Sequence, residues 1–220
     1  MVTEEKKDYD QNEDLESNLD LNPNLVDGFI ETGLSSNSGR PWYILETNQL
    51  LVVAIFGVMG GFISSIVPFS QLVKVWYPLP GGTQLMSGHH IIWATLSYGI
   101  TKRKVSCVYC MFIKGILEML LGDSWGAFII VINLIEGAGV ALGFIVMKRF
   151  NEETTTLGWA LAAGLGNFTQ APIFWYLTGR IYILHPTIAI LAFIFAFISG
   201  AVIGGVLGKK ISERVLRALE

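Results

Sequence analysis

The sequence predicts an all-α integral membrane protein in which six transmembrane helices form one bundle. Of its 220 residues, 52% are hydrophobic and only 15% are charged. From residue 47 onward, most of the chain consists of apolar segments of the kind that cross about 30 Å of hydrocarbon. We expect three parts: an acidic, disordered tail over 1–46, a six-helix membrane domain over 47–208 and a basic segment over 209–220.

The composition and motifs of the sequence argue against several classes of function. The net charge of −3 does not favour nucleic-acid binding. A phosphate-binding loop and common hydrolase motifs are absent, so we expect no enzyme, no catalytic residue and no cofactor. The energy for any uphill transport would have to come from another protein. Cys107 and Cys110 form a C-x-x-C pair, but neither a redox fold nor two further zinc ligands accompany them. We interpret them as small apolar helix residues and expect no metal site.

Six apolar segments are the expected helices. They run from about 47 to 68, 89 to 101, 105 to 121, 125 to 147, 157 to 177 and 187 to 208. The connection between the first two is the only long one, and its prolines and glycines rule out a regular helix through its middle. Because Trp76 and Tyr77 are apolar enough to fold back onto the bundle, this connection is expected to be a binding loop or lid.

Basic residues predict the orientation in the membrane. Most of them occur in the tail, in alternate loops and at the C-terminal end, namely Lys6, Lys7, Arg40, Lys102, Arg103, Lys104, Lys148, Arg149, Lys209, Lys210, Arg214 and Arg217. The opposite loops contain only Lys74 and Arg180. By the positive-inside rule, both termini are cytoplasmic and the long first loop is extracellular, as in a multi-pass protein of the cell membrane.

Two carboxylates within apolar sequence are the leading candidates for function. Glu118 and Glu136 flank the polar turn at residues 122–124. A carboxylate near the bilayer centre costs on the order of 3 kcal/mol, so each should face a protein interior, a polar cavity or a cation. Lys114 lies one turn before Glu118, which leaves open either a structural ion pair or a binding role. Glu136 has Asn133 one turn before it and no basic residue of its own helix nearby, so a cationic ligand is one candidate partner. Asn133 is a further candidate for substrate binding.

Further polar residues extend the predicted binding site. His89 and His90 open the second helix, and adjacent helical residues cannot easily chelate one metal. One of them, taken as His89, is a candidate ligand contact, with interfacial histidines as the alternative. Asn167 and Gln170 lie mid-helix shortly before Pro172, at a level that should adjoin a polar cavity or neighbouring side chains.

Small residues on the first helix predict a close helix contact. Gly57, Gly61 and Ser65 are spaced four apart, which places them in one stripe along the helix. The stripe could pack against another helix of this chain or serve as a docking face for a second protein, and the sequence leaves both open.

The middle of the chain resembles a known family. The segment 88–144, with L-E-M-L-L-G-D-S-W-G followed by I-E-G-A-G, is similar to the substrate-binding S components of energy-coupling factor (ECF) transporters. It is most similar to the group linked to thiamine and its hydroxymethylpyrimidine precursor, and the segment I-S-G-A-V-I-G-G-V-L-G-K-K over 198–210 shares this resemblance. The match covers roughly residues 47–212 and leaves out the acidic tail.

The resemblance implies a six-helix bundle in the lipid bilayer that captures a vitamin-like small molecule from outside. Its implied partners are a transmembrane T component, toward which Gly57, Gly61 and Ser65 would face, and two cytoplasmic ATPases. The family's site would lie near Trp76, Tyr77, Glu118, Glu136, Asn167 and Gln170. The nickel and cobalt branch has a histidine directly after the initiator methionine, whereas this chain has Val2.

The residues themselves agree with this implication in outline. A cationic or aminopyrimidine-like heteroaromatic would favour carboxylates and flat aromatic faces. The sequence offers both, in Glu118, Glu136, Trp76, Trp93, Trp125 and Trp175. The main alternative is a stand-alone carrier or channel for a small solute; a membrane-embedded enzyme using His89, His90 and Glu118 is a more distant one.

Overall fold

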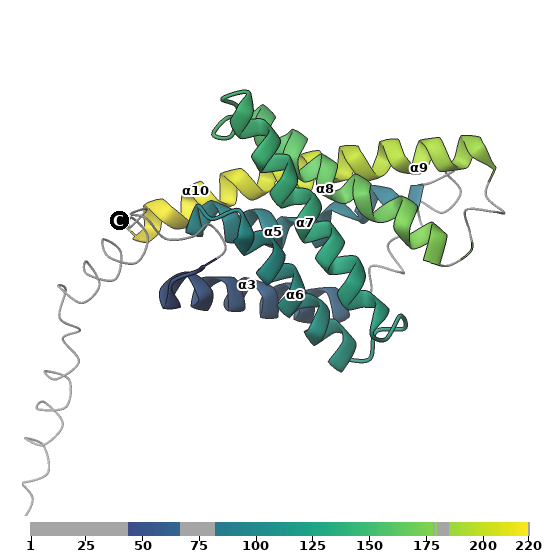
Figure 1. Ribbon diagram of the computed structural model, residues 1–220, viewed down its shortest axis with the longest axis horizontal. Coiled ribbons are helices and arrows are strands. Elements are labelled where there is room, and N and C mark those ends of the chain that lie inside the picture. The colour runs from purple at the N-terminus through teal and green to yellow at the C-terminus, as the bar shows by residue number, and fades with distance from the viewer. Residues whose placement is uncertain (1–43, 67–81, 178, 180–184, 220) are drawn as a thin grey trace, which may run out of the picture. The chain divides into compact units, whose positions relative to one another are not determined.

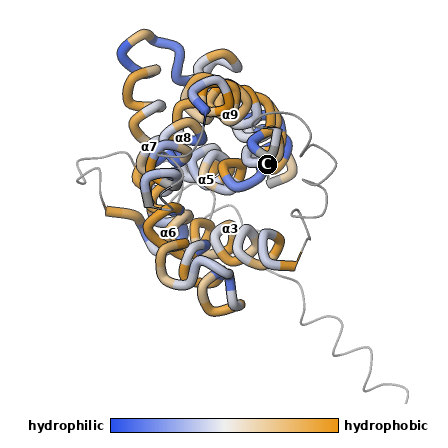
Figure 2. The backbone as a smooth tube through the Cα atoms, turned by 90° about the vertical axis from the view of Figure 1, so that its right-hand side faces the viewer, coloured by the Kyte–Doolittle hydropathy of each residue, from blue (hydrophilic) through white to orange (hydrophobic). Residues whose placement is uncertain are grey.

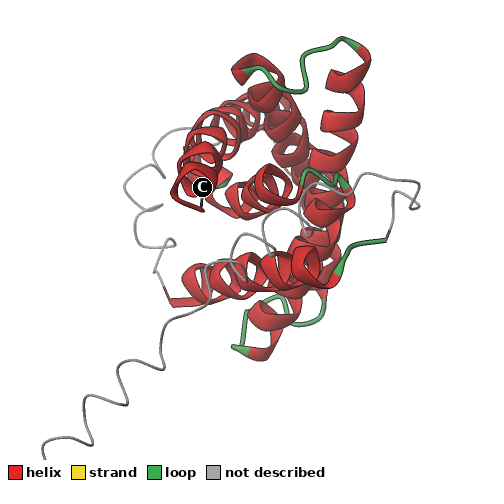
Figure 3. Cartoon of the chain, turned by 90° about the vertical axis from the view of Figure 1, so that its left-hand side faces the viewer, coloured by secondary structure: helices red, strands yellow, loops and turns green. Residues whose placement is uncertain are grey.

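The computed structural model describes residues 44–66, 82–177, 179 and 185–219. Helices account for nearly all of this part of the chain, and it contains no strand (Figure 3). The helices are α3 (Thr47–Ile66), α5 (Gly88–Thr101), α6 (Val105–Leu120), α7 (Phe128–Arg149), α8 (Thr156–Leu177) and α9 (Pro186–Ser199), which continues through η4 (Gly200–Leu207) into α10 (Gly208–Leu219); a short 3₁₀ helix, η2 (Gly82–Met86), precedes α5 (Figure 1). The all-α prediction is therefore confirmed, with helices at all six expected positions.

In the part of the chain that the structure describes, three helices are long and apolar enough to cross a membrane. They are Thr47–Ile66, Phe128–Arg149 and the continuous helix Pro186–Ala218. Most of the helical backbone is coloured hydrophobic or intermediate in Figure 2, and the turn between α7 and α8 at the top of the view is hydrophilic. α5 and α6 are shorter than a full crossing, with 14 and 16 residues. The six membrane crossings and the cytoplasmic location of both termini remain predictions.

α5 is the most enclosed helix among those described. Ten of its fourteen residues are buried. Seen from the side shown in Figure 2, it lies inside a ring formed by the other helices. Tyr98 near its C-terminal end packs against Phe144 and Trp159, with ring centroids 3.9 Å and 5.5 Å away. Every residue over 94–101 is buried, so the C-terminal half of α5 is its most enclosed part, while His89, His90, Ile92 and Trp93 near the N-terminal end are only partly buried.

Glycines allow the helices to pack closely, and their contacts show the relative direction of each helix pair. A Cβ atom on Gly57 would lie 2.9 Å from the carbonyl oxygen of Cys110, and one on Gly61 would lie 3.0 Å from that of Lys114. Because both contacts advance by four residues, α3 and α6 run parallel. α7 runs antiparallel to α8, since a Cβ atom on Gly139 would lie 2.9 Å from the backbone of Gly166 and one on Gly143 would lie 2.6 Å from that of Ala162. Such close approach requires the absence of a side chain.

The last helix contains a π-helical segment, η4, where its glycines pack against α8 and α5. η4 has π-helical geometry, which is rare and usually confined to short stretches of a longer helix. Its Gly200 and Gly205 lie against the backbone of α8, and its Gly204 lies against Ile91 of α5. The hydroxyl of Thr95 donates to the carbonyl of Gly204 at 2.7 Å. The helix then continues to Leu219, so the basic C-terminal segment extends the sixth predicted helix without a break.

The turn between α6 and α7 is longer than the sequence suggested. α7 begins at Phe128 and not at Trp125. Gly122 and Gly126 adopt positive φ values of 88° and 55°, which are incompatible with continuing the helix. The Asp123 carboxylate accepts a hydrogen bond from the Trp125 backbone at 2.8 Å and stabilises the turn.

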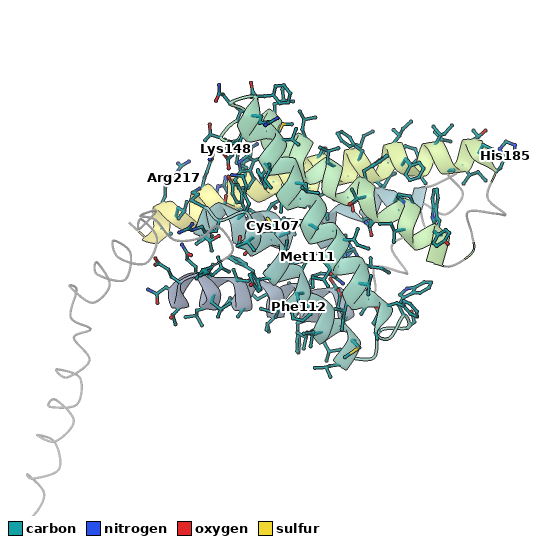
Figure 4. The ribbon with its side chains drawn as sticks, viewed as in Figure 1. Cys107, Met111, Phe112, Lys148, His185 and Arg217 are labelled. Carbon is teal, nitrogen blue, oxygen red and sulfur yellow. The ribbon has the colours of Figure 1, made fainter. Side chains whose placement is uncertain are left out.

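An ion pair joins two loops at the end of the bundle where Lys148 and Arg217 lie, opposite His185 (Figure 4). Glu153, between α7 and α8, accepts hydrogen bonds from the Lys104 ammonium and, at 2.6 Å, from the hydroxyl of Tyr98. Partial burial opposes ionisation of Glu153, but these hydrogen bonds outweigh it and hold the pKa of the carboxyl below its ordinary value. This contact ties the loop after α5 to the loop after α7.

Candidate functional site

A buried ion pair forms the centre of the candidate site. Lys114 is fully buried and Glu118 is 2% exposed. The Lys114 ammonium donates to the Glu118 carboxylate at 2.6 Å and to the side-chain oxygen of Asn133 at 2.8 Å. The Asn133 amide in turn donates to the other Glu118 oxygen at 2.8 Å. The i,i+4 spacing thus brings the pair together as predicted, and Asn133 of α7 completes a closed triangle.

His90 adds a fourth member to this cluster. Its Nδ1 atom lies 3.0 Å from the Lys114 ammonium and 3.9 Å from Glu118. Because an ammonium can only donate, Nδ1 accepts, and a neutral ring then carries its proton on Nε2. His89, the histidine predicted from the sequence, bonds through Nδ1 to the Met86 carbonyl instead. The choice between the two depends on the rotation of α5 about its axis, which the sequence does not reveal.

Glu136 differs from the other buried charged residues. It is 2% exposed and lies one turn from Asn133 on α7. Over the residues that the structure describes, no hydrogen bond or ion pair reaches its carboxylate, although Lys114 and Glu118 act on it electrostatically. Lys114 is already paired with Glu118. The cluster of one ammonium and two carboxylates therefore carries an excess of negative charge when all three are ionised.

Asn167 and Gln170 belong to a second polar cluster. The Asn167 amide donates to the Ser87 hydroxyl at 2.7 Å and to the Ala196 carbonyl at 2.6 Å, while its oxygen accepts from Gln170 at 2.5 Å. Ser199 extends the cluster, because its hydroxyl accepts from the Gly88 backbone at 2.9 Å and donates to the Leu85 carbonyl. These bonds fix η2 and the start of α5 against α8 and α9.

The two clusters meet at the N-terminal end of α5. Ser87 belongs to one cluster and His90, three residues later, to the other. The hydrogen-bonding groups of Asn167 have partners within the protein and hold this end of α5 in place, and the substrate-binding role of Asn167 and Gln170 stays a prediction. Ser87 and Ser199 were not among the predicted residues, since their partners lie 80 and 111 residues away in the chain.

The remaining predicted residues lie elsewhere. Trp76 and Tyr77 fall outside the described residues. Gly57 and Gly61 are buried against α6, whereas Ser65 is exposed. Of the two uses considered for this stripe, packing within the chain therefore accounts for both glycines. A docking role for the three residues stays a prediction.

Cys107 and Cys110 are buried, unpaired thiols. Their sulfur atoms lie 3.4 Å from the carbonyl oxygens of Ala94 and Trp93, to which they donate. Figure 4 shows Cys107 and Met111 along α6, and both side chains are fully buried while Phe112 is exposed. Within the described ranges, no group of three or more His, Cys, Asp or Glu side chains is arranged to hold a metal ion.

The fold matches that of a solved transport protein. A crystal structure of an S component of an ECF transporter superposes with a TM-score of 0.69, over 80% of this chain and 87% of that protein, at 18% sequence identity. This similarity concerns the fold. No curated protein matches the chain by sequence.

A family model identifies the chain more directly. Residues 48–169 match the family described as "ABC-type cobalt transport system, permease component". This segment includes α3, α5, α6, α7 and the part of α8 that carries Asn167. The protein belongs to this family of membrane transport proteins.

Proposed function

We propose that the protein is the substrate-capture S component of an ATP-driven ECF-type uptake transporter. The observation that carries the proposal is Glu136, a buried carboxylate without a bonded partner in the described part of the chain, beside the neutralised Lys114–Glu118 pair. A carboxylate in this position is costly unless a cation or a hydrogen-bond donor reaches it. A ligand that supplies such a group would be bound selectively.

Chemistry and resemblance together favour a vitamin-like heteroaromatic cation or amine. An organic cation or amino group can pair with Glu136, and the His90 ring offers a hydrogen-bonding edge nearby. Thiamine combines a positive charge with an aminopyrimidine, and hydroxymethylpyrimidine carries the amino group alone. The sequence resemblance points to the same two compounds, and they are the substrates we propose.

The proposed function requires partners, because the chain lacks the motifs of an ATPase. A transmembrane T component and two cytoplasmic ATPases would supply the transport step, and the chain itself would be no enzyme. α3 is suited to contact a membrane partner or lipid, since its outward side chains are large and apolar: Leu50, Leu51, Ile55, Val58, Met59, Phe62 and Ile66 are all exposed. The expected location is the cell membrane.

Glu136→Gln tests the proposal. The substitution keeps the shape but removes the charge, so we expect thiamine to bind at least tenfold more weakly, because hydrogen bonds to charged groups are worth about 1.5–3 kcal/mol. Binding is measured by titration calorimetry on purified protein in detergent. Glu152→Gln, in the loop at the opposite end of α7, is the matched control and should bind as the wild type does.

Other outcomes would change the conclusion. Equal affinity of Glu136→Gln and wild type would remove Glu136 from the site. The family description names cobalt, so Co²⁺ is titrated in parallel; binding of Co²⁺ but not of thiamine would replace a vitamin by a metal as the substrate. Solute uptake by the chain alone in liposomes would instead indicate a stand-alone carrier or channel.

A further inference from the structure

Two buried polar atoms beside the candidate site have no hydrogen-bond partner among the described residues. They are the indole nitrogen of Trp93 on α5 and the hydroxyl oxygen of Ser64 on α3. Buried Trp N–H groups usually find an acceptor, and a helical serine usually bonds to a carbonyl one turn earlier. Leaving such a group unsatisfied is unfavourable, so each one calls for an explanation.

Packing places both atoms on the side of the cluster that faces α3. The Trp93 ring lies against Gly60, where an added Cβ atom would be 2.7 Å from the ring. Trp93 is three residues after His90 and therefore lies on the same face of α5. His90 in turn contacts Lys114. Trp93 thus borders the charged cluster from the α5 side.

Ser64 borders the cluster from α3. It lies one turn after Gly60, which contacts Trp93, and three residues after Gly61, which contacts the backbone of Lys114. Residues at these spacings share one helix face, so Ser64 lies on the face of α3 that is turned toward α5 and α6. Because α3 and α6 run parallel, Ser64 lies further along the bundle toward the level of Glu118.

We propose that the Trp93 N–H and the Ser64 hydroxyl donate hydrogen bonds to the substrate. This inference rests on the proposed function and specifies it further: the substrate presents acceptor atoms toward α3 and α5, and a donor or positive charge toward Glu136. A heteroaromatic ring with ring nitrogens and an exocyclic amino group has both kinds of atom at its edge. A simple alkylammonium ion, which has no acceptor, would leave Trp93 and Ser64 unsatisfied.

Trp93→Phe and Ser64→Ala test this inference. Both remove a donor and leave an apolar group, and each should weaken thiamine binding about five- to tenfold in titration calorimetry. Trp159→Phe is the matched control: Trp159 is buried beside Tyr98, away from the cluster, and its substitution should leave the affinity unchanged. Unchanged affinity in both Trp93→Phe and Ser64→Ala, with the wild type binding thiamine, would overturn the inference and leave the proposed function standing.

Thermal unfolding of the ligand-free protein is a second test, because it shows whether a donor is already hydrogen-bonded within the protein. If the two donors await a substrate, removing the Ser64 hydroxyl should not lower the unfolding temperature of the ligand-free protein, because no hydrogen bond is lost. A loss of several degrees in Ser64→Ala would show a structural hydrogen bond and would overturn the inference. Trp93→Phe is compared by binding alone, because the smaller ring also loses packing against Gly60. Failure of thiamine to bind the wild type would refute the proposed substrate, and the ligand-free comparison would still decide whether the Ser64 hydroxyl is open.

Discussion

Replacing Lys114 by methionine should destabilise the protein strongly. The side chain is fully buried, and its ammonium donates to Glu118, Asn133 and His90. Without it, the Glu118 carboxylate keeps only the amide of Asn133 as a described donor. Removing one member of a buried ion pair costs about 3–5 kcal/mol, because the remaining charge is left without compensation. At about 2–4 °C per kcal/mol for a chain of this size, the unfolding temperature should fall by roughly 6–20 °C.

The assay is thermal unfolding of purified protein in detergent, with a double variant as the decisive comparison. Lys114→Met combined with Glu118→Gln removes both charges, so it should recover a large part of the lost stability. Lys148→Met, an exposed lysine at the end of α7, is the control for the same substitution and should unfold within about 2 °C of the wild type. Wild-type stability of Lys114→Met, or a double variant less stable than Lys114→Met alone, would refute the account of a charge-compensated cluster.

Two further predictions concern packing and pH. Gly143→Ala should destabilise by about 1–3 kcal/mol, because the added methyl would meet the Ala162 backbone at 2.6 Å. A variant that unfolds at the temperature of the wild type would contradict this view of the α7–α8 contact. Since the pKa of Glu153 is lower in the folded protein, its ionisation stabilises the fold above the unfolded-state pKa of about 4.3, and this contribution disappears as pH falls through the folded pKa. Glu153→Gln should therefore unfold at a lower temperature than wild type at pH 7 and approach it near pH 3, and a difference that does not shrink on acidification would exclude the linkage.

Local sequence patterns predicted the helices and the ion pair for physical reasons. Runs of apolar residues interrupted by polar ones locate helices, and the four-residue spacing of Lys114 and Glu118 determines that their side chains can meet. The same local logic failed at Trp125, where two glycines with positive φ delay the start of α7. Such a turn depends on backbone angles that the apolar pattern does not record.

Contacts between distant segments could not be predicted. Whether His89 or His90 reaches Lys114 depends on how α5 is rotated against α6, and both rotations suit the same sequence. Asn167 was predicted to bind substrate because it is a polar residue in mid-helix, yet its partners include Ser87, which lies 80 residues earlier in the chain. The unpartnered donors of Trp93 and Ser64 likewise become visible only once α3 and α5 are packed together.

The most direct test of the central claim is to identify what the protein captures. The full chain is purified in mild detergent from cells supplied with thiamine, denatured, and analysed by mass spectrometry for released small molecules. We expect thiamine or a related aminopyrimidine at close to one molecule per chain, and a marked reduction in Glu136→Gln prepared in the same way. Wild-type protein that releases no such compound, and whose unfolding temperature thiamine does not raise, would contradict the account.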